Sequence, residues 1–327
     1  MNSWFDASVR ETVERVWGLT VVAELPLRSV VGLLTDRGRL IVKLHTGQPA
    51  RVEQRLAALA AVRLQLERMG VCTAPLLTLH GAASHPGGGG RLAVEPWLRG
   101  QHADFRAASD QCAAARAIAR LHCARPSIPF ALDQAPTLLQ KLASRLSSAD
   151  QVVANGRLRG IGVDRWRRFR RLAESALRAA MESPGAAAIR ANRLHNPFCH
   201  RDLAPHNILV RAGEPAQLID FDLAGQDDAC ADVYQLLTHI RYWVPTDRAV
   251  SSRVLDAYES VRPLEEGSID LLERLCPYPA ILLREVAELR FARDAVARQR
   301  AARRVAYAAT VEEERMRAAS CYTGRVC

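Results

Sequence analysis

The sequence predicts an α+β protein in which a small antiparallel sheet with one inserted helix precedes a larger, mostly helical region. Short runs rich in Val, Leu and Ile, separated by turn-forming residues, dominate the chain up to Gly100. Beyond Gly100, apolar residues recur at helical spacing and only two short runs resemble strands. The chain has 327 residues, 49% of them hydrophobic, which is enough to bury a substantial core. We therefore expect two units, residues 1–99 and residues 100–327.

The N-terminal unit is expected to begin with a helix and to continue as an antiparallel meander. Apolar residues at helical spacing predict a helix over Ser8–Trp17, and a second helix, Ala50–Met69, is inserted after the third strand. The segment His85–Gly90 is expected to be a flexible tip between the last two strands. The five predicted strands are bounded by turn-forming residues: Thr20–Leu25, Ser29–Thr35, Arg39–Leu44, Leu76–His80 and Arg91–Trp97.

The second unit is expected to be helical around two strand-like runs. The runs Asn207–Arg211 and Ala216–Phe221 are short and apolar. The predicted helices share an amphipathic spacing: Asp110–Cys123, Leu138–Ser147, Arg165–Met181 and, with interruptions at two prolines, Ser251–Ala319.

The segment His200–Asn207 (HRDLAPHN) has the H-R-D-x-x-x-x-N spacing of a kinase catalytic loop. Asp202 would accept the proton of an attacking hydroxyl group. Asn207, at the far end of this loop, offers a neutral amide oxygen to a magnesium ion. The loop is therefore the predicted centre of the chemistry.

A second acidic segment, Ile219–Asp222 (IDFD), follows at the end of an apolar strand. A hairpin whose two strands flank the catalytic loop would bring the Asp220 carboxylate beside Asn207. These two residues, with phosphate oxygens, supply the hard ligands that Mg²⁺ prefers. Asp222 has two open interpretations, because it either touches a second metal ion or caps the next loop.

Lys43 ends an apolar run in the predicted third strand, which is the place of the phosphate-binding lysine in the V-A-I-K strand of kinases. A lysine at the end of an apolar strand usually reaches into solvent. This chain, however, has only two lysines, Lys43 and Lys141, and one of them stands at the expected place. The expected partner of Lys43 is Glu53 on the following helix, and Glu67 is the second candidate.

The last strand of the sheet is expected to lead into a hinge whose backbone groups bind an adenine. Glu95 and Trp97 are therefore candidate nucleotide-binding residues, although packing is the simpler explanation for Trp97. The turn after the first strand lacks a G-x-G-x-x-G pattern, which leaves fewer backbone amides for phosphate, with Arg28 or Ser29 as candidates to assist. We expect weaker nucleotide binding than in protein kinases.

With these segments, the chain resembles the aminoglycoside phosphotransferase and choline kinase superfamily over roughly residues 25–237. Leu121–His122 looks like the family's helix end before the catalytic region, and Asp232 looks like the aspartate that braces the catalytic loop. The resemblance implies a bilobal protein-kinase-like fold, ATP and Mg²⁺ as cofactors, and transfer of phosphate to a hydroxyl group of a small molecule or a protein. No activation segment of the protein-kinase type is present, which disfavours regulation by loop phosphorylation.

Within the superfamily, the sequence is most similar to spore-coat kinase-like proteins. The similar features are residues 35–43, the Cys199–Asp202 start of the catalytic loop, and Leu275–Pro279 before a long charged helix. This similarity names no substrate. It keeps open a rival hypothesis, a non-catalytic kinase-fold protein that acts by binding, for example as a coat component.

The charge balance limits the choice of partners. The chain carries 45 basic and 35 acidic residues, a net charge of +10, which disfavours a polycationic aminoglycoside as acceptor and favours a neutral or anionic one. Nucleic-acid binding is disfavoured because no recognised module accompanies the charge. No stretch approaches the roughly 18 apolar residues of a membrane span, and the N-terminal segment does not resemble a secretory signal. We expect a cytoplasmic protein, with the spore coat as the alternative location.

Overall fold

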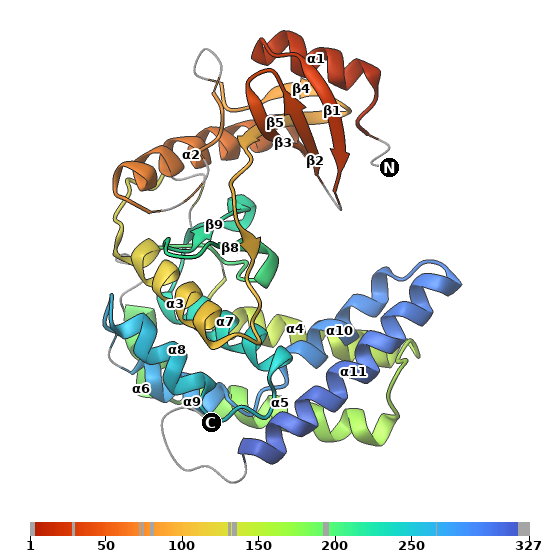
Figure 1. Cartoon of the computed structure of the whole chain (residues 1–327). Helices are drawn as coiled ribbons and strands as arrows, with labels where there is room; N and C mark the ends of the chain where they lie inside the picture. Colours follow the sequence, from red (N-terminus) through yellow and green to blue (C-terminus); the bar gives the residue numbers. More distant parts are fainter. Residues whose placement is uncertain are drawn as a thin grey trace.

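The computed structural model describes residues 4–27, 30–71, 73, 75–78, 82–129, 132, 136–191, 196–265 and 267–319. These residues form two lobes, a small one built on a sheet and a larger one that is mostly helical, as Figure 1 shows. The chain passes from the small lobe to the large one after the last strand of the sheet.

The small lobe contains one five-stranded antiparallel sheet, with the strands in the order β1-β2-β3-β5-β4. In the pairing of β3 with β5, Lys43 lies opposite Ala93, and Ile41 lies opposite Glu95. The predicted sheet is confirmed, and so is the helix inserted after its third strand. The bounds are β1 (Val21–Pro26), β2 (Val31–Thr35), β3 (Gly38–His45), α2 (Pro49–Arg68), β4 (His85–Gly87) and β5 (Gly90–Pro96).

The fourth strand lies at a different place from the one predicted. It is His85–Gly87, inside the segment that was expected to be a flexible tip. The turn at residues 88–89 has φ angles of 60° and 78°, which glycine adopts without steric cost, and this lets the chain fold back into β5. In the run predicted as this strand, Leu77 donates one backbone hydrogen bond to Val94 (2.8 Å), while residues 79–81 lie outside the described part.

The two faces of the sheet are covered differently. Helix α1 (Ala7–Trp17) packs on one face and closes an apolar cluster with Val42 and Val94. Because side chains alternate along a strand, their neighbours Lys43 and Glu95 point to the opposite face, where α2 packs. The sheet therefore directs its charged side chains away from α1 and toward the large lobe.

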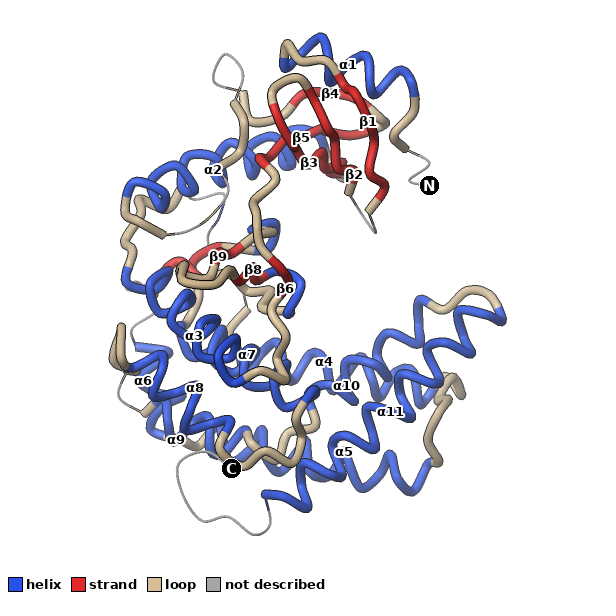
Figure 2. The backbone as a smooth tube through the Cα atoms, viewed as in Figure 1, coloured by secondary structure: helices blue, strands red, loops and turns tan. Residues whose placement is uncertain are grey.

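The large lobe is built mainly from helices, in the order drawn in Figures 1 and 2. Predicted helices after Gly100 are confirmed, although several run longer than expected. Among the described residues, no helix combines the length and apolar character that crossing a membrane requires. The bounds are α3 (Ala108–Cys123), α4 (Leu138–Ala154), α5 (Val163–Met181), α6 (Pro184–Ala191), α7 (Ala229–Trp243), α8 (Val250–Glu259), α9 (Ser268–Leu275), α10 (Ala280–Glu288), η5 (Leu289–Phe291) and α11 (Ala295–Ala319).

Short strands surround the predicted catalytic loop where the two lobes meet. The pairing of β8 with β9 confirms the expected hairpin, and β6 extends it to three strands. A second pair, β7 with β10, flanks the other end of the loop. The bounds are β6 (Gln101–His102), β7 (Phe198–Cys199), η3 (Pro205–Asn207), β8 (Ile208–Val210), β9 (Gln217–Leu218), η4 (Phe221–Leu223) and β10 (Gly225–Gln226).

Candidate active site

The predicted catalytic loop and the acidic segment after β9 share an unusual backbone conformation. Arg201 has a φ of 66° and Asp220 a φ of 63°, and in the described part of the chain no other non-glycine residue has a positive φ. Such a conformation costs on the order of 1–3 kcal/mol and persists only where surrounding contacts enforce it. Both residues lie in the predicted site, which suggests that the fold holds their side chains in a defined direction.

The backbone of the catalytic loop is held by Asp232 of α7. Its carboxylate accepts hydrogen bonds from the N–H groups of His200 (2.7 Å) and Arg201 (2.9 Å). His122, at the end of α3, binds the same carboxylate through Nε2 (3.2 Å), while its Nδ1 lies 2.8 Å from the hydroxyl of Tyr258. We call His122, Asp232 and Tyr258 the loop brace. It bears out the structural role expected for Asp232.

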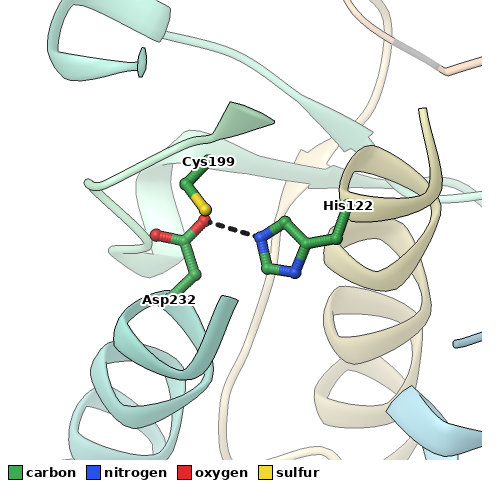
Figure 3. A group of neighbouring side chains, drawn as sticks. All are labelled: His122, Cys199 and Asp232. Carbon is green, nitrogen blue, oxygen red and sulfur yellow. Dashed lines mark hydrogen bonds and ion pairs between the residues drawn. The ribbon is translucent and has the colours of Figure 1, made fainter. Parts of the chain in front are cut away.

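Two residues of the loop brace, His122 and Asp232, form a group with Cys199 that has the ligand types of a metal site. One atom of each of these three side chains lies within 4.8 Å of the others (Figure 3). These atoms already have partners, since the Cys199 thiol donates to the carbonyl of Asp227 (3.3 Å) and both nitrogens of His122 are hydrogen-bonded. Burial also raises the pKa of Cys199 well above its ordinary value, which keeps the thiol protonated. We interpret this group as a structural brace.

Asp220 is tied to the catalytic loop by the residue before it. The carbonyl of Ile219 accepts from Nε2 of His200 (2.8 Å), and its N–H donates to the carbonyl of Asn207 (3.0 Å). Nδ1 of His200 in turn accepts from the N–H of Asp202 (3.3 Å), which fixes the imidazole as a neutral ring with its proton on Nε2. Burial lowers the pKa of His200, in agreement with this state. The loop and Asp220 therefore form one hydrogen-bonded unit.

Three predicted site residues converge at this unit. The side-chain amide of Asn207 donates to the carbonyl of Asp202 (3.0 Å), which leaves its oxygen free to accept or to bind a cation. The side chain of Asp220 is 40% exposed. Within the described residues, the carboxylate of Asp202 makes no hydrogen bond or ion pair, so it is available to a ligand.

Lys43 of the sheet reaches this unit across the boundary between the lobes. Its Nζ lies 2.8 Å from Asp220, 3.3 Å from Asp222 and 3.1 Å from Glu95. Although burial favours the neutral amine, the carboxylates of Glu95, Asp222 and Asp220 raise the pKa of Lys43 above its ordinary value. We call these four residues the Lys43 cluster. The lysine and the acidic segment, predicted separately from distant parts of the sequence, are therefore in direct contact.

The partner expected for Lys43 is corrected by the structure. Glu53 lies in the first turns of α2 and binds Arg91 of β5 (2.6 Å), while Glu67 is exposed near the end of α2. The small-lobe carboxylate that pairs with Lys43 is instead Glu95. It lies on the adjacent strand β5, two residues beyond Ala93, the residue directly opposite Lys43. Strand register thus brings a carboxylate to the lysine without any contribution from a helix glutamate.

Glu95 is buried between two cations. Its second oxygen accepts from Nη2 of Arg63 of α2 (2.9 Å), and the Arg63 guanidinium also lies 5.5 Å from the centre of the Phe221 ring. Glu95 and Arg63 are only 4% and 1% exposed. Burial raises the pKa of Glu95, but Arg63 and Lys43 outweigh it and hold the pKa at about 2. Glu95 is therefore a buried, ionised carboxylate.

The hinge residue Trp97 lies on the sheet. A side chain at Gly32 would approach Cζ3 of Trp97 to 2.4 Å, so the indole covers this glycine on the face that carries Lys43. The N–H of Trp97 donates to the carbonyl of Arg39 (3.0 Å) and is not free for an adenine. Arg28 and Ser29, the residues considered for phosphate binding, lie outside the described residues.

Arginines that sequence reasoning did not single out hold the acidic segment. Arg55 of α2 donates to the carbonyls of Asp222 (2.6 Å) and Ala224 (3.0 Å), and Arg201 pairs with Asp227 (3.3 Å). The sequence did indicate that α2 presents arginines together, because Arg55 and Arg63 are about two turns apart and lie on one side of this helix. The role of Arg201 depends on a backbone conformation that sequence spacing does not reveal.

Two arginines of the large lobe, Arg145 and Arg284, lie near His239 of α7. Burial, together with the nearby side chains of Arg284, His206 and Arg145, lowers the pKa of His239, on α7, to about 3. Among the described residues, Arg145 of α4 has no hydrogen bond or ion pair, and burial lowers its pKa. Arg284 pairs with Glu285 (3.0 Å), so of these two arginines Arg145 alone has no partner among the described residues.

Comparison with solved structures places the fold. An aminoglycoside phosphotransferase from Alicyclobacillus acidocaldarius shares 19% identity and a TM-score of 0.71, over 98% of this chain and 94% of that one. A spectinomycin phosphotransferase in complex with ADP and spectinomycin shares 12% identity and a TM-score of 0.60, over 94% and 98% of the two chains. A choline kinase from Streptococcus pneumoniae is 13% identical in sequence and has a TM-score of 0.55, over 96% of this chain and 98% of that one. These likenesses confirm the expected protein-kinase-like fold.

Comparison at the level of sequence identifies the family. No curated protein matches the chain. Residues 27–319, which include every residue of the candidate site, match the phosphotransferase enzyme family. The chain therefore belongs to the phosphotransferase enzyme family.

Proposed function

We propose that the protein transfers the terminal phosphate of ATP to a hydroxyl group of a small molecule, with Mg²⁺ as cofactor. The observation that carries this proposal is the 2.8 Å contact between Lys43 Nζ and Asp220. It joins a lysine of residues 1–99 to the acidic segment of residues 100–327, as phosphoryl transfer between two lobes requires. The carboxylate of Asp202 has no partner among the described residues. The ADP in the spectinomycin phosphotransferase supports a nucleotide as phosphate donor.

The residues present suit a magnesium ion. Asn207 and Asp220 offer an amide oxygen and a carboxylate, which are hard oxygen ligands, and Asp222 is the further candidate. Bound there with the nucleotide, Mg²⁺ would neutralise charge on the phosphate oxygens. Lys43 would contribute a fixed positive charge to the same phosphates.

Asp202 is proposed as the base. Its carboxylate is the one in the catalytic loop without a partner among the described residues, and the N–H of Asp202 is fixed by His200. It would orient the hydroxyl group of the acceptor and take its proton as the bond to phosphorus forms. Most of the rate would come from this positioning together with the charges around the phosphate.

The acceptor is proposed to be a neutral or anionic small molecule. The names of the similar structures include an aminopropanol kinase, choline kinases and antibiotic phosphotransferases, so small hydroxyl compounds are the first class to test. The net charge of +10, together with Arg145, which has no partner among the described residues, disfavours a polycationic aminoglycoside.

A rival function is supported by the missing glycine-rich turn between β1 and β2. A kinase-fold protein that binds a partner without transferring phosphate, such as the spore-coat component that the sequence resembles, would not need that turn. The intact set of Lys43, Asp202 and Asp220 argues against this rival, and we rank it second.

Nucleotide binding and labelled phosphate transfer separate the two functions. We expect MgATP to raise the melting temperature, and ATP without Mg²⁺ to raise it much less. We expect labelled phosphate from ATP to pass to at least one compound in a panel of sugars, amino alcohols and hydroxy acids, with a protein panel alongside. A protein that binds MgATP but neither hydrolyses it nor labels any acceptor would favour the rival, and one that does not bind MgATP would contradict the proposal.

A further inference from the structure

We propose that Glu95, fixed by Arg63, positions Lys43 for phosphate binding, and that α2 contributes a cation where a helix glutamate was expected. This inference rests on the proposed function for its kinetic consequence. The structural part, that Glu95 is the lasting anchor of the Lys43 ammonium group, is tested without any measurement of activity.

The sheet itself makes the pairing of Lys43 with Glu95. Ile41 lies opposite Glu95 and Lys43 lies opposite Ala93 on adjacent strands, so Lys43 and Glu95 are diagonal neighbours on one face. Their charged atoms are 3.1 Å apart. Because backbone hydrogen bonds lock β3 to β5, the register of the two strands sets the spacing of this pair.

Glu95 is the one partner that Lys43 is expected to keep when ligands bind. The side chains of Asp220 and Asp222 are 40% and 38% exposed and belong to the segment proposed to receive the metal ion. Oxygens that bind Mg²⁺ are no longer full partners of an ammonium group. Glu95, with a side chain only 6% exposed, has no such competitor and remains to aim Nζ.

Arg63 keeps Glu95 ionised and connects it to the acidic segment. A buried carboxylate needs compensating charge, and Glu95 gives one oxygen to Lys43 and the other to Arg63 (2.9 Å). The Arg63 guanidinium also lies 5.5 Å from the Phe221 ring, next to Asp220. Arg63 therefore contacts both the anchor of the lysine and the segment that the lysine touches, which makes it a positioning residue too.

Chemical labelling of lysine tests the anchor directly, because the chain has only Lys43 and Lys141. Acylation of amines with limiting reagent at pH 8, read by peptide mass spectrometry, gives the rate at Lys43 with Lys141 as internal reference. Glu95→Gln removes a negative charge from a buried lysine, so we expect Lys43 to react about tenfold faster relative to Lys141. Glu53→Gln, which disrupts only the pair with Arg91, is the matched control and should leave the ratio unchanged.

The double variant Glu95→Gln/Arg63→Met separates positioning from stability. Removing Glu95 alone leaves Arg63 buried without a partner and risks unfolding, whereas removing both charges replaces the pair with neutral groups of similar size. If Glu95 positions Lys43, the double variant folds, shows the same faster labelling, and turns over MgATP at least about thirtyfold more slowly in kcat. A merely structural pair predicts wild-type kcat in the folded double variant, and that result would overturn the inference.

The two proposals fail in different ways. Wild-type protein that binds or turns over no MgATP contradicts the proposed function, while the labelling ratio still decides whether Glu95 holds Lys43. Active wild-type protein with an unchanged labelling ratio in both variants contradicts the positioning role alone.

Discussion

The loop brace and the Lys43 cluster are both groups of polar side chains next to the catalytic loop, but they use their hydrogen-bonding capacity differently. In the loop brace, Asp232 is 1% exposed and accepts from two backbone N–H groups and from His122. In the Lys43 cluster, one lysine is shared among three carboxylates, and two of these are more than a third exposed.

This difference indicates that the loop brace has a structural role and that the Lys43 cluster is the group able to take part in chemistry. A buried network whose donors and acceptors are all matched has no position left for a ligand, and it pays for its own desolvation only while it stays complete. A cluster with several acids around one base has oxygens that change partners when a cation or a phosphate arrives. The comparison predicts that damage to the loop brace appears as lost stability, and that damage near the Lys43 cluster appears as lost activity.

The largest effect is expected for Asp202→Asn, which changes the proposed catalytic base and leaves the loop brace intact. The amide is almost the same size but cannot accept a proton, so phosphate transfer should fall by about 10³-fold or more. The affinity for MgATP and the melting temperature should stay near wild type. Transfer assays with labelled ATP, together with a thermal shift titration, measure all three.

The control for that variant is Asp164→Asn, since Asp164 is an exposed carboxylate that pairs with Arg167 on α5, far along the chain from the loop. It should transfer phosphate normally. Wild-type rates in Asp202→Asn would remove Asp202 from the mechanism.

Asp232→Ala tests the other region. It removes the acceptor for the N–H groups of His200 and Arg201 and the partner of His122, groups that are buried or partly buried, so we expect a loss of about 3 kcal/mol or more in the free energy of unfolding. Urea denaturation measures this loss, and Asp164→Ala, at an exposed position, should change it by less than about 0.5 kcal/mol. An Asp232→Ala protein as stable as wild type would show that the loop holds its conformation without the brace.

Much of this comparison was predictable from sequence, because it depends on spacing along the chain. The patterns around His200–Asn207, Asp220 and Lys43 predicted which residues meet, and the hairpin of β8 with β9 brings Asp220 next to the catalytic loop. The partner of Lys43 was not predictable in this way. The kinase pattern favoured a glutamate on α2, although spacing did not decide between Glu53 and Glu67. The pairing of β3 with β5 supplies Glu95 instead, and strand register is a tertiary property.

The misplaced fourth strand has a similar origin. Local composition favoured Leu76–His80, which is apolar, over His85–Gly87, which is rich in turn residues. The two-residue turn at residues 88–89 brings His85–Gly87 directly back onto β5, so the geometry of the hairpin outweighs intrinsic strand preference.

Two carboxyl groups at the start of α7 can be compared directly. Asp228, the N-cap of this helix, lies one turn before Asp232, and the pKa of Asp228 is raised whereas that of Asp232 is lowered. Burial raises the pKa of Asp228 from 3.8 to about 7, and its Oδ2 has no hydrogen-bond partner among the described residues. The folded protein then keeps this proton up to about pH 7, while the unfolded chain releases it near pH 4. Stability is therefore lost as the pH rises through this window.

Asp228→Asn removes that titration and keeps a side-chain oxygen for the N–H of Cys230 at the start of α7. The stability gained by the variant over wild type should grow by about 2 kcal/mol between pH 5 and pH 7 and level off above pH 7. Urea denaturation across this range measures it. A gain that does not depend on pH would show that Asp228 is ionised throughout.

The smallest effect is expected at the edge of the Lys43 cluster, where Trp97 covers Gly32. A methyl group at residue 32 would lie 2.4 Å from the indole, so Gly32→Ala should displace Trp97 from the face of the sheet that carries Lys43. If the indole forms part of the adenine site, ATP should bind about tenfold more weakly, since a contact of this size is worth about 1.4 kcal/mol.

Gly162→Ala, at a position with open space around it, is the matched control. Tryptophan fluorescence reports the displacement and a thermal shift titration reports the affinity. An altered emission spectrum with unchanged affinity would assign Trp97 to the packing of the sheet, and would limit the reactive region to the charged residues around Lys43.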